Sequence, residues 1–186
     1  MLPQLIDVPL SAWFHAHHDP LLTQFMLAIS LWHSTAGILL MAAVLGVVLA
    51  RTGRPWWLFA LALSVPGGLL LNVAVKNLVQ RPRPHFDDAL LTLHTYSFPS
   101  GHTAGATVFY GFLAAFLFAH VRDRPRRIAI AAAAVAMVLL VGVSRMYLGV
   151  HFFTDVFGAI VEGVLWLGLC LGGVQALHSR RGGAVA

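Results

Sequence analysis

Residues 56–76 read WWLFALALSVPGGLLLNVAVK, an apolar stretch with no charged side chain before Lys76. An α-helix crosses a bilayer core about 30 Å thick with roughly 20 residues, so this stretch predicts a membrane span. Four more apolar stretches predict spans: 21–49, 103–120, 128–146 and 152–177. Backbone polar groups find no water in lipid, which favours helices, and long uninterrupted runs argue against barrel strands. We therefore predict an all-α fold, a polytopic transmembrane helical bundle of about five spans.

The composition is typical of a membrane protein rather than of a soluble domain. Of the 186 residues, 59% are hydrophobic and 10% are charged, and the mean hydropathy is +0.80. Soluble domains are roughly half apolar and about a quarter charged. The length favours a single membrane-embedded domain over residues 1–186. The lone Cys170 excludes an intramolecular disulfide framework and a metal site built from several thiolates.

The formal net charge of +5 does not come from one basic patch, which makes nucleic acid a poor fit as a partner. Eight of the twelve Lys and Arg residues lie at the ends of apolar stretches: Arg51, Arg54, Arg122, Arg124, Arg126, Arg127, Arg180 and Arg181. The positive-inside tendency then puts RTGRP, VRDRPRR and the tail 178–186 in the cytoplasm. The segment 77–102, the turn 147–151 and the N-terminal twenty residues lie on the opposite face.

The N-terminal segment 1–20 is predicted to lie at the membrane interface. It mixes Trp13 with the histidines of HAHH at 15–18, and it lacks the basic start and apolar centre of a cleaved signal peptide. We expect no carboxylate or thiolate partner for these histidines. An interfacial role is therefore favoured over a metal site for them.

Three polar islands interrupt the apolar chain, and all are predicted on the same outer face: KNLVQRPRP at 76–84, FPSGHT at 98–103 and SRMYLGVHFFTD at 144–155. In the third island, His151 and Asp155 share one helix face if the last span begins near His151. A carboxylate there can accept the proton of one imidazole nitrogen and leave the other free to attack. A polar pair capping a helix end is the alternative for this motif alone.

The second island predicts an anion site at a helix N-terminus. Pro99-Ser100-Gly101 is a turn leading into a helix, so backbone N–H groups, including that of Gly101, can face an anion. Ser100 adds a hydroxyl donor, and His102 in the first helical turn can give a proton to a leaving-group oxygen. A Ser N-cap followed by a solvated histidine is the alternative if this motif stood alone.

Cationic side chains complete the predicted anion site. Lys76, Arg83 and Arg145 can neutralise a multiply charged oxyanion from different directions, because arginine offers a planar fork of donors and lysine a compact charge. A snorkelling or lipid-headgroup role is the alternative for each base individually. For Arg81, this snorkelling or headgroup role is the one we expect.

The three islands resemble the tripartite signature of the type-two phosphatidic acid phosphatase superfamily: K, six residues, RP; then PSGH; then SR, five residues, H, three residues, D. Every fixed position is present between Lys76 and Asp155, in the family order and spacing. The resemblance implies that His151 attacks phosphorus to form a phosphohistidine and that Asp155 orients it. His102 then protonates the departing group and activates water. The implied phosphate-binding residues are Lys76, Arg83, Ser100, Gly101 and Arg145.

The same resemblance implies a site without metal or cofactor, because its cations take the place that magnesium fills in many other phosphoryl-transfer sites. Membrane members of the family commonly have six spans, whereas five are counted here. The first span is therefore expected to be missing or replaced by the segment 1–20. Glu162 lies inside a predicted span, where an ionisable group is costly. For it we expect an interhelical hydrogen bond ahead of a catalytic role.

The leading functional hypothesis is a lipid phosphate or diphosphate phosphatase of the inner or plasma membrane, with its site on the periplasmic or extracytoplasmic face. The resemblance implies undecaprenyl diphosphate, phosphatidylglycerophosphate or phosphatidate as substrate, and the small bundle slightly favours the isoprenoid diphosphate. Soluble vanadate-dependent haloperoxidases share a similar site, but five spans argue against that activity. The same residues are also compatible with a lipid phosphotransferase, or with a non-catalytic binder or transporter of anionic lipids. The sequence does not identify a protein partner.

Overall fold

The computed structural model describes residues 2–180, with side chains from residue 5 onward. Its described residues form seven helices and no strands. They are α1 (Leu2–Ala16), α2 (Pro20–Trp32), α3 (Thr35–Arg51), α4 (Pro55–Val79), α5 (Gly101–His120), α6 (Arg124–Tyr147) and α7 (Phe153–Arg180). The predicted all-α bundle is thus confirmed. Of the predicted tail 178–186, residues 181–186 lie outside the described residues.

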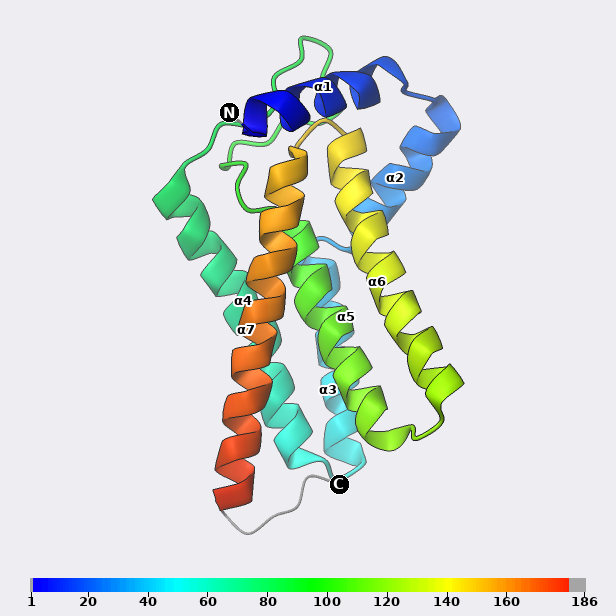
Figure 1. Ribbon diagram of the computed structural model, residues 1–186, viewed down its shortest axis with the longest axis vertical. Helices are drawn as coiled ribbons and strands as arrows, with labels where there is room; N and C mark the ends of the chain where they lie inside the picture. Colours follow the sequence, from blue (N-terminus) through cyan, green and yellow to red (C-terminus); the bar gives the residue numbers. More distant parts are fainter. Residues whose placement is uncertain (1, 181–186) are drawn as a thin grey trace.

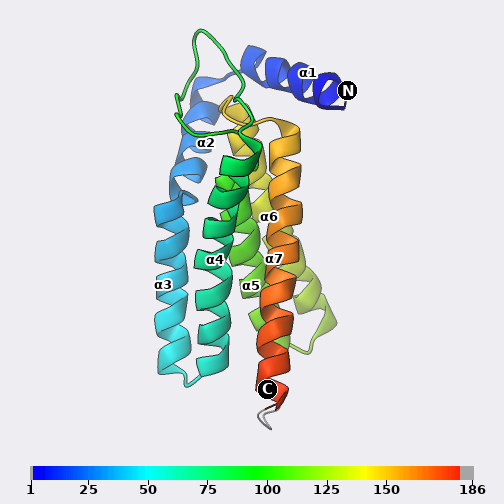
Figure 2. The ribbon, with the colours of Figure 1, turned by 90° about the vertical axis from the view of Figure 1, so that its left-hand side faces the viewer.

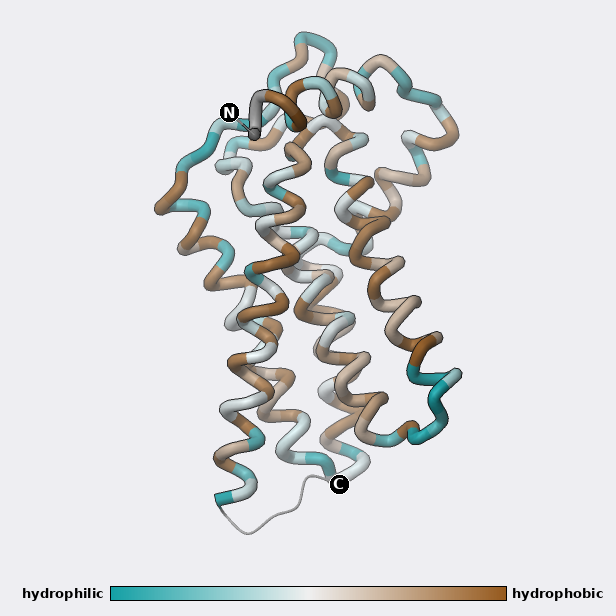
Figure 3. Tube along the Cα trace, in the orientation of Figure 1, coloured by the Kyte–Doolittle hydropathy of each residue, from teal (hydrophilic) through white to brown (hydrophobic). Residues whose placement is uncertain are grey.

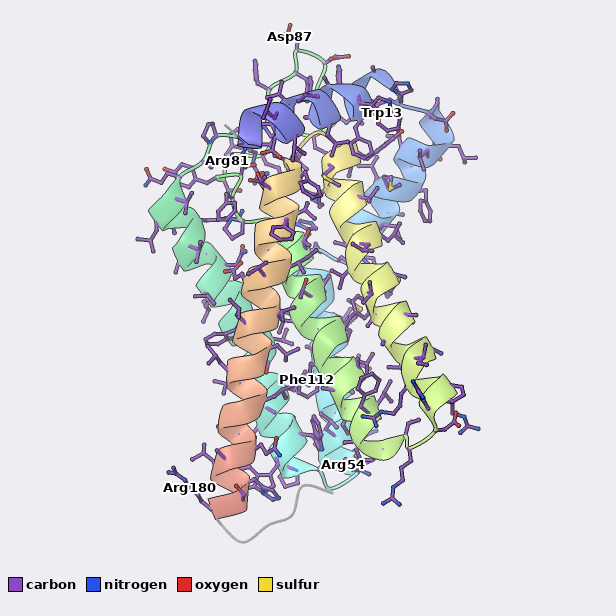
Figure 4. All side chains as sticks on the ribbon, in the orientation of Figure 1. Trp13, Arg54, Arg81, Asp87, Phe112 and Arg180 are labelled. Atoms are coloured by element: carbon purple, nitrogen blue, oxygen red, sulfur yellow. The ribbon has the colours of Figure 1, made fainter. Side chains whose placement is uncertain are left out.

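The helix α5 is the centre of the bundle, because α3, α4, α6 and α7 all pack against it. Figures 1 and 2 show these helices running side by side along the long axis. The core formed around α5 is apolar, and Phe112, labelled in Figure 4, has no exposed surface. Glycines permit close contacts along this core: a Cβ at Gly111 would lie 2.6 Å from Leu167 of α7. The start of α5 lies close to the last turn of α4 and the first turn of α7.

Four helices, α4 to α7, are long and apolar enough to cross a membrane, and α2 with α3 makes a fifth if that bent pair is one span. Large apolar side chains point outward from them, and Leu70 and Leu169 are each 72% exposed. Figure 3 shows hydrophobic residues along the helices and hydrophilic ones gathered mainly at the two ends. An outward apolar surface of this kind requires lipid around it. The chain is an integral membrane protein.

The predicted first span, 21–49, is not one straight helix. It divides into α2 and α3, which are bent by 54° at a short break. Ser34 caps α3 by accepting a hydrogen bond from the backbone N–H of Gly37 (3.2 Å). A Cβ at Gly37 would lie 1.9 Å from the carbonyl oxygen of Trp32, so only glycine permits this close approach. The bend matters to the site because α2 packs against α6.

Replacing Gly37 by Ala is therefore expected to destabilise the protein by about 1–3 kcal/mol, because the added Cβ must push the backbone of α2 away. The measurement is the thermal unfolding midpoint in detergent. Gly172→Ala is the matched control, since a Cβ there meets nothing within 4 Å. A helical Gly→Ala change in open space is neutral or stabilising. Equal midpoints for the two variants would contradict the proposed role of Gly37.

The two ends of the bundle differ in their charged residues and in the segments that lie there. Helix α1, from the predicted interfacial segment, lies across one end of the bundle (Figure 1). In Figure 4, Trp13, Arg81 and Asp87 lie at this end, whereas Arg54 and Arg180 lie at the opposite one. This agrees with the predicted separation of the arginine-rich connections from the polar islands. Assignment of the arginine-rich end to the cytoplasm stays a prediction.

Candidate active site

The three polar islands meet at the end of the bundle that α1 covers. The first begins in the last turn of α4 and continues into the loop after it, the second opens α5, and the third runs from the end of α6 through a turn into α7. All eight predicted site residues therefore lie around the N-terminus of α5. Hydrogen bonds and ion pairs between the islands bring their side chains into one cluster.

His151 lies in the turn between α6 and α7, and only 2% of its surface is exposed. Its Nδ1 is 3.6 Å from Oδ2 of Asp155, which is an ion-pair distance but longer than a hydrogen bond. Its Nε2 is 3.2 Å from Nη1 of Arg83, which can donate to it. An accepting Nε2 places the imidazole proton on Nδ1, toward Asp155. The nitrogen that faces the cationic cluster is then the one that carries no proton.

Asp155 is fully buried and has several hydrogen-bond donors. Its Oδ2 accepts from the hydroxyl of Ser97 (2.5 Å) and from the backbone N–H of Phe152 (2.8 Å). Its Oδ1 accepts from Nη1 of Arg81 (2.6 Å). The bond to Phe152 is the returning half of a capping box, because Asp155 is the third residue of α7. Asp155 therefore both starts α7 and faces His151.

Arg83 is held beside His151 by backbone oxygens. Its Nη1 donates to the carbonyl of Val150 (2.6 Å), and its Nε donates to the carbonyl of Thr95 (2.7 Å). Its Nη2 donates to the hydroxyl of Thr95 (2.8 Å) and to the carbonyl of Tyr96 (3.1 Å). These bonds fix a planar cation at the edge of the imidazole without neutralising its charge. Burial lowers the pKa of Arg83, but an arginine remains protonated.

Lys76 lies against the loop that leads into α5. Its Nζ donates to the carbonyls of Pro99 (2.5 Å), Tyr96 (3.0 Å) and Ser97 (3.4 Å). The ammonium group has three donors, so it shapes this loop as well as supplying charge. Its Cε would lie 3.9 Å from a Cβ at Gly101, which shows how closely α4 approaches the start of α5.

The start of α5 presents Ser100, Gly101 and His102. Ser100 is the N-cap residue, but its side chain makes no bond to the backbone of α5. Its Oγ accepts from the hydroxyl of Thr103 (3.0 Å), and its backbone N–H donates to the carbonyl of Asp155 (3.1 Å). The loop before α5 is therefore tied to α7. The side chain of His102, in the first turn, makes no hydrogen bond within the described part of the chain.

Arg145 brings a fourth helix to the cluster. It lies near the end of α6, is 2% exposed, and its Nη1 donates to the hydroxyl of Ser30 on α2. Its Nε is buried and has no hydrogen-bond partner within residues 5–180. Such a donor is costly unless an acceptor reaches it. An oxyanion in the cluster is the kind of acceptor that would satisfy it.

Burial lowers the pKa of His151 to about 3, and the cations Arg83 and Arg145 act in the same direction while Asp155 opposes them. The folded pKa thus lies below the ordinary value of about 6.5. Below pH 6.5 the unfolded chain takes up a proton that the folded protein does not, so stability falls as pH falls from about 6.5 toward about 3. Neutral His151 is therefore the resting form at physiological pH.

The expected loss of unfolding free energy from His151 is about 2 kcal/mol between about pH 7 and about pH 5. The measurement is the thermal unfolding midpoint in detergent at both pH values. In His151→Gln the group is gone, so the midpoint should fall less on acidification than in the wild type. An equal fall in both proteins would show that His151 is not held neutral by the fold.

One sequence-based expectation about a cation was wrong. Arg81 is not a snorkelling or headgroup cation, because it donates to Asp155 and, through Nη2, to Asp7 of α1 (2.8 Å). Two further residues of this network, Ser97 and Asp7, were not predicted from the sequence. Two features of the sequence could have pointed to these residues. Arg81 lies in the first polar island, and Asp7 is a lone acidic residue in an otherwise apolar helical turn.

Two more expectations can be compared with the structure. Nδ2 of Asn72 on α4 donates to Oε2 of Glu162 on α7 (2.8 Å), so the expected interhelical hydrogen bond is confirmed. The histidines at 15–18 were expected to lack a carboxylate neighbour, and this was wrong. Nε2 of His15 lies 3.0 Å from Oδ1 of Asp88, which belongs to the long loop after α4 and is distant in the sequence.

Comparison with known proteins gives consistent matches. A family model described as the PAP2 superfamily matches residues 55–179. The chain is 33% identical over 150 residues to phosphatidylglycerophosphatase B of Bacillus subtilis (strain 168), an alignment that covers 79% of this chain and 72% of that relative. The family match includes all three polar islands.

Two solved structures resemble the whole bundle. A transmembrane PAP2-type phosphatidylglycerolphosphate phosphatase from Bacillus subtilis has a TM-score of 0.81 and 30% identity, over 90% of this chain and 84% of that chain. Aquifex aeolicus LpxE has a TM-score of 0.72 and 28% identity, over 89% of this chain and 94% of that chain. The likeness thus extends well beyond the motifs to the arrangement of the helices.

Proposed function

Because the chain belongs to the PAP2 superfamily of membrane lipid phosphatases, we propose that it hydrolyses a lipid phosphate or diphosphate monoester through a phosphohistidine intermediate, without a metal ion. The observation that supports this most directly is the environment of His151. Its two nitrogens face different partners, Arg83 on one side and Asp155 on the other. An imidazole in this arrangement is a nucleophile with a fixed tautomer, next to a group that binds oxyanions.

In the first step, the electron pair on Nε2 of His151 attacks phosphorus, and the bond between phosphorus and the leaving oxygen breaks. Protonated His102 gives its proton to that oxygen, which departs as an alcohol or a phosphate. The imidazole becomes positively charged as the N–P bond forms, and the negative charge of Asp155 stabilises it. Arg83, Arg145 and the N-terminus of α5 stabilise the charge on the phosphoryl oxygens.

In the second step, neutral His102 takes a proton from water as the water oxygen attacks phosphorus. The N–P bond breaks, inorganic phosphate leaves, and the electron pair returns to Nε2 of His151. Protonated His102 is thereby restored for the next cycle. The same histidine serves as acid and then as base because the second step is the reverse of the first, with water in place of the leaving group.

A lateral groove supports a lipid substrate. A hollow of about 480 Å³ lies between α4 and α7, next to the loop that Lys76 holds. Apolar side chains form most of its wall: Val75, Phe98, Pro99, Phe157, Val161 and Leu165. A hydrocarbon chain can lie in such a groove within the membrane while its phosphate enters the cationic cluster.

We propose phosphatidylglycerophosphate as the first substrate to test, because the similar curated protein and the similar solved structure from Bacillus subtilis are each named for that activity. Undecaprenyl diphosphate and phosphatidate remain candidates beside it. We also propose that the site faces the periplasmic or extracytoplasmic side of an inner or plasma membrane, since the arginine-rich end lies opposite to it.

The test is phosphate release by purified protein in detergent from these three lipids, each with and without a chelator. We expect turnover of at least one lipid, with phosphatidylglycerophosphate hydrolysed fastest, and no effect of the chelator. Loss of turnover on chelation would overturn the metal-independent mechanism. Binding of the lipids without phosphate release would favour a non-catalytic binder of anionic lipids.

A further inference from the structure

We infer that Arg81 and Asp7 are positioning residues for catalysis, which act through Asp155 and make helix α1 part of the active-site support. This inference rests on the proposed function, because it concerns how the nucleophile His151 is oriented. Neither residue is one of the fixed positions of the three-part motif. In Figure 4, Arg81 lies close to α1 and the start of α7.

Arg81 joins two buried carboxylates. Its Nη1 donates to Oδ1 of Asp155 (2.6 Å), and its Nη2 donates to Oδ2 of Asp7 (2.8 Å). The two carboxylates are 0% and 1% exposed, and the Arg81 side chain is 21% exposed. Its guanidinium carbon also lies 4.4 Å from the centre of the ring of Phe152, which is next to His151 in the chain. Ion pairs with so little exposure are screened much less than surface pairs.

Asp7 ties α1 to the first turn of α7. Its Oδ1 accepts from the backbone N–H of Thr154 (2.9 Å), and its Oδ2 accepts from the hydroxyl of Thr154 (2.5 Å). That N–H belongs to the first turn of α7, where backbone donors have no partner within their own helix. Asp7 therefore caps α7 from a different helix, 147 residues earlier in the chain.

This network determines which way Asp155 faces. Arg81 holds Oδ1, so the carboxylate cannot rotate freely, and Oδ2 stays directed toward His151 and the donors on Ser97 and Phe152. The distance between Nδ1 of His151 and Oδ2 of Asp155 is already 3.6 Å, so the interaction tolerates little further movement of the carboxylate. A small rotation of the carboxylate would end its influence on the imidazole. Misplacement of a catalytic group by about 1 Å can cost about 100-fold in rate.

Asp7 also balances charge. If Arg81 had Asp155 as its only anionic partner, the pair would be neutral, and less negative charge would remain to stabilise a positively charged His151. With Asp7 present, two carboxylates share one guanidinium, and the group of three keeps a net negative charge beside the imidazole. Asp7 thereby has an electrostatic role in addition to its cap on α7.

The experiment compares Asp7→Asn and Arg81→Lys in the full-length protein, each made in the wild type and in Asp155→Asn. Arg81→Lys keeps the positive charge but cannot bridge two carboxylates with a planar fork. Asp88→Asn is the matched control, because it removes another contact of α1, the ion pair with His15, without touching Asp155. Steady-state phosphate release gives kcat and KM, and thermal unfolding in detergent verifies that each variant is folded.

In the wild type, we expect each substitution to lower kcat by about 10- to 100-fold with KM changed less than about twofold, because neither residue touches substrate. In Asp155→Asn, the same substitutions should change kcat less than about twofold, since the group through which they act is already disabled. Asp88→Asn should keep wild-type kcat. Should either substitution fail to fold, the other still decides the question.

The inference is overturned if both variants keep wild-type kcat, or if they lose the same factor in both backgrounds, which is the signature of a purely structural role. A rise in KM alone would place the residues in substrate binding and also overturn it. A wild-type protein that releases no phosphate from any lipid would instead overturn the proposed function itself, so the two failures are distinguishable.

Discussion

Replacing His151 by Ala is expected to lower phosphate release by at least about four orders of magnitude, because the proposed nucleophile is removed. His151 is buried, its Nε2 faces Arg83, and its Nδ1 faces Asp155. In the His151→Ala variant, water would have to attack phosphorus directly. No nucleophilic side chain would be held next to the cationic cluster. The measurement is phosphate release at saturating lipid.

The control for that variant is His94→Ala, which changes another histidine on the same end of the protein, exposed in the loop after α4. It should retain wild-type turnover. The thermal unfolding midpoint of His151→Ala should be measured alongside, so that a loss of fold is recognised. A folded His151→Ala protein with more than a few per cent of wild-type turnover would remove His151 from the nucleophile role.

The second large effect is expected for His102→Ala, with a loss of about 100- to 10,000-fold on a lipid substrate. A poor leaving group must be protonated as it departs, and the side chain of His102 stands in the first turn of α5 without a hydrogen bond to any described residue. On p-nitrophenyl phosphate, whose leaving group needs no proton, the first step should be affected much less. We therefore expect a burst of p-nitrophenol followed by slow turnover, because in the proposed mechanism His102 also activates water in the second step.

Stopped-flow absorbance on p-nitrophenyl phosphate measures the burst directly. The burst amplitude should approach one p-nitrophenol per protein molecule in His102→Ala and should be absent in His151→Ala. An equal loss on lipid and on p-nitrophenyl phosphate, with no burst, would indicate that His102 does not act as the proton donor.

Much of the fold and of the site could be predicted from the sequence, because both depend on local patterns. Apolar stretches of membrane length predicted the helices, and the motif spacing located the cluster from Lys76 to Asp155. The bend between α2 and α3 was not predicted, since it depends on a close approach of Gly37 to the carbonyl of Trp32. The hydropathy pattern of the sequence does not reveal such a contact.

The relation of His151 to Asp155 depends on more than spacing along a helix. A spacing of four residues suggested one shared helix face, but α7 begins at Phe153, so His151 lies in the turn before it. The two side chains still face each other because Asp155 reaches back to the N–H of Phe152.

The roles of Arg81 and Asp7 could not be predicted for a different reason. Arg81 lies 74 residues from each of its two partners, Asp155 and Asp7, and no periodicity connects them. A lone arginine near a membrane surface is usually a headgroup contact, and a lone aspartate in an interfacial helix is usually solvated. Only the three-dimensional arrangement brings both against the carboxylate that faces His151.

The most direct test of the central claim, that His151 forms a covalent bond to phosphorus, is to quench the protein with alkali during turnover of a lipid that carries radioactive phosphorus and to locate the label by peptide mass spectrometry. We expect a phosphoramidate that survives alkali, is lost in acid, and maps to His151. It should accumulate in His102→Ala and be absent in His151→Ala. A label on another residue, or full turnover with no trapped phosphoprotein in His102→Ala, would contradict the account.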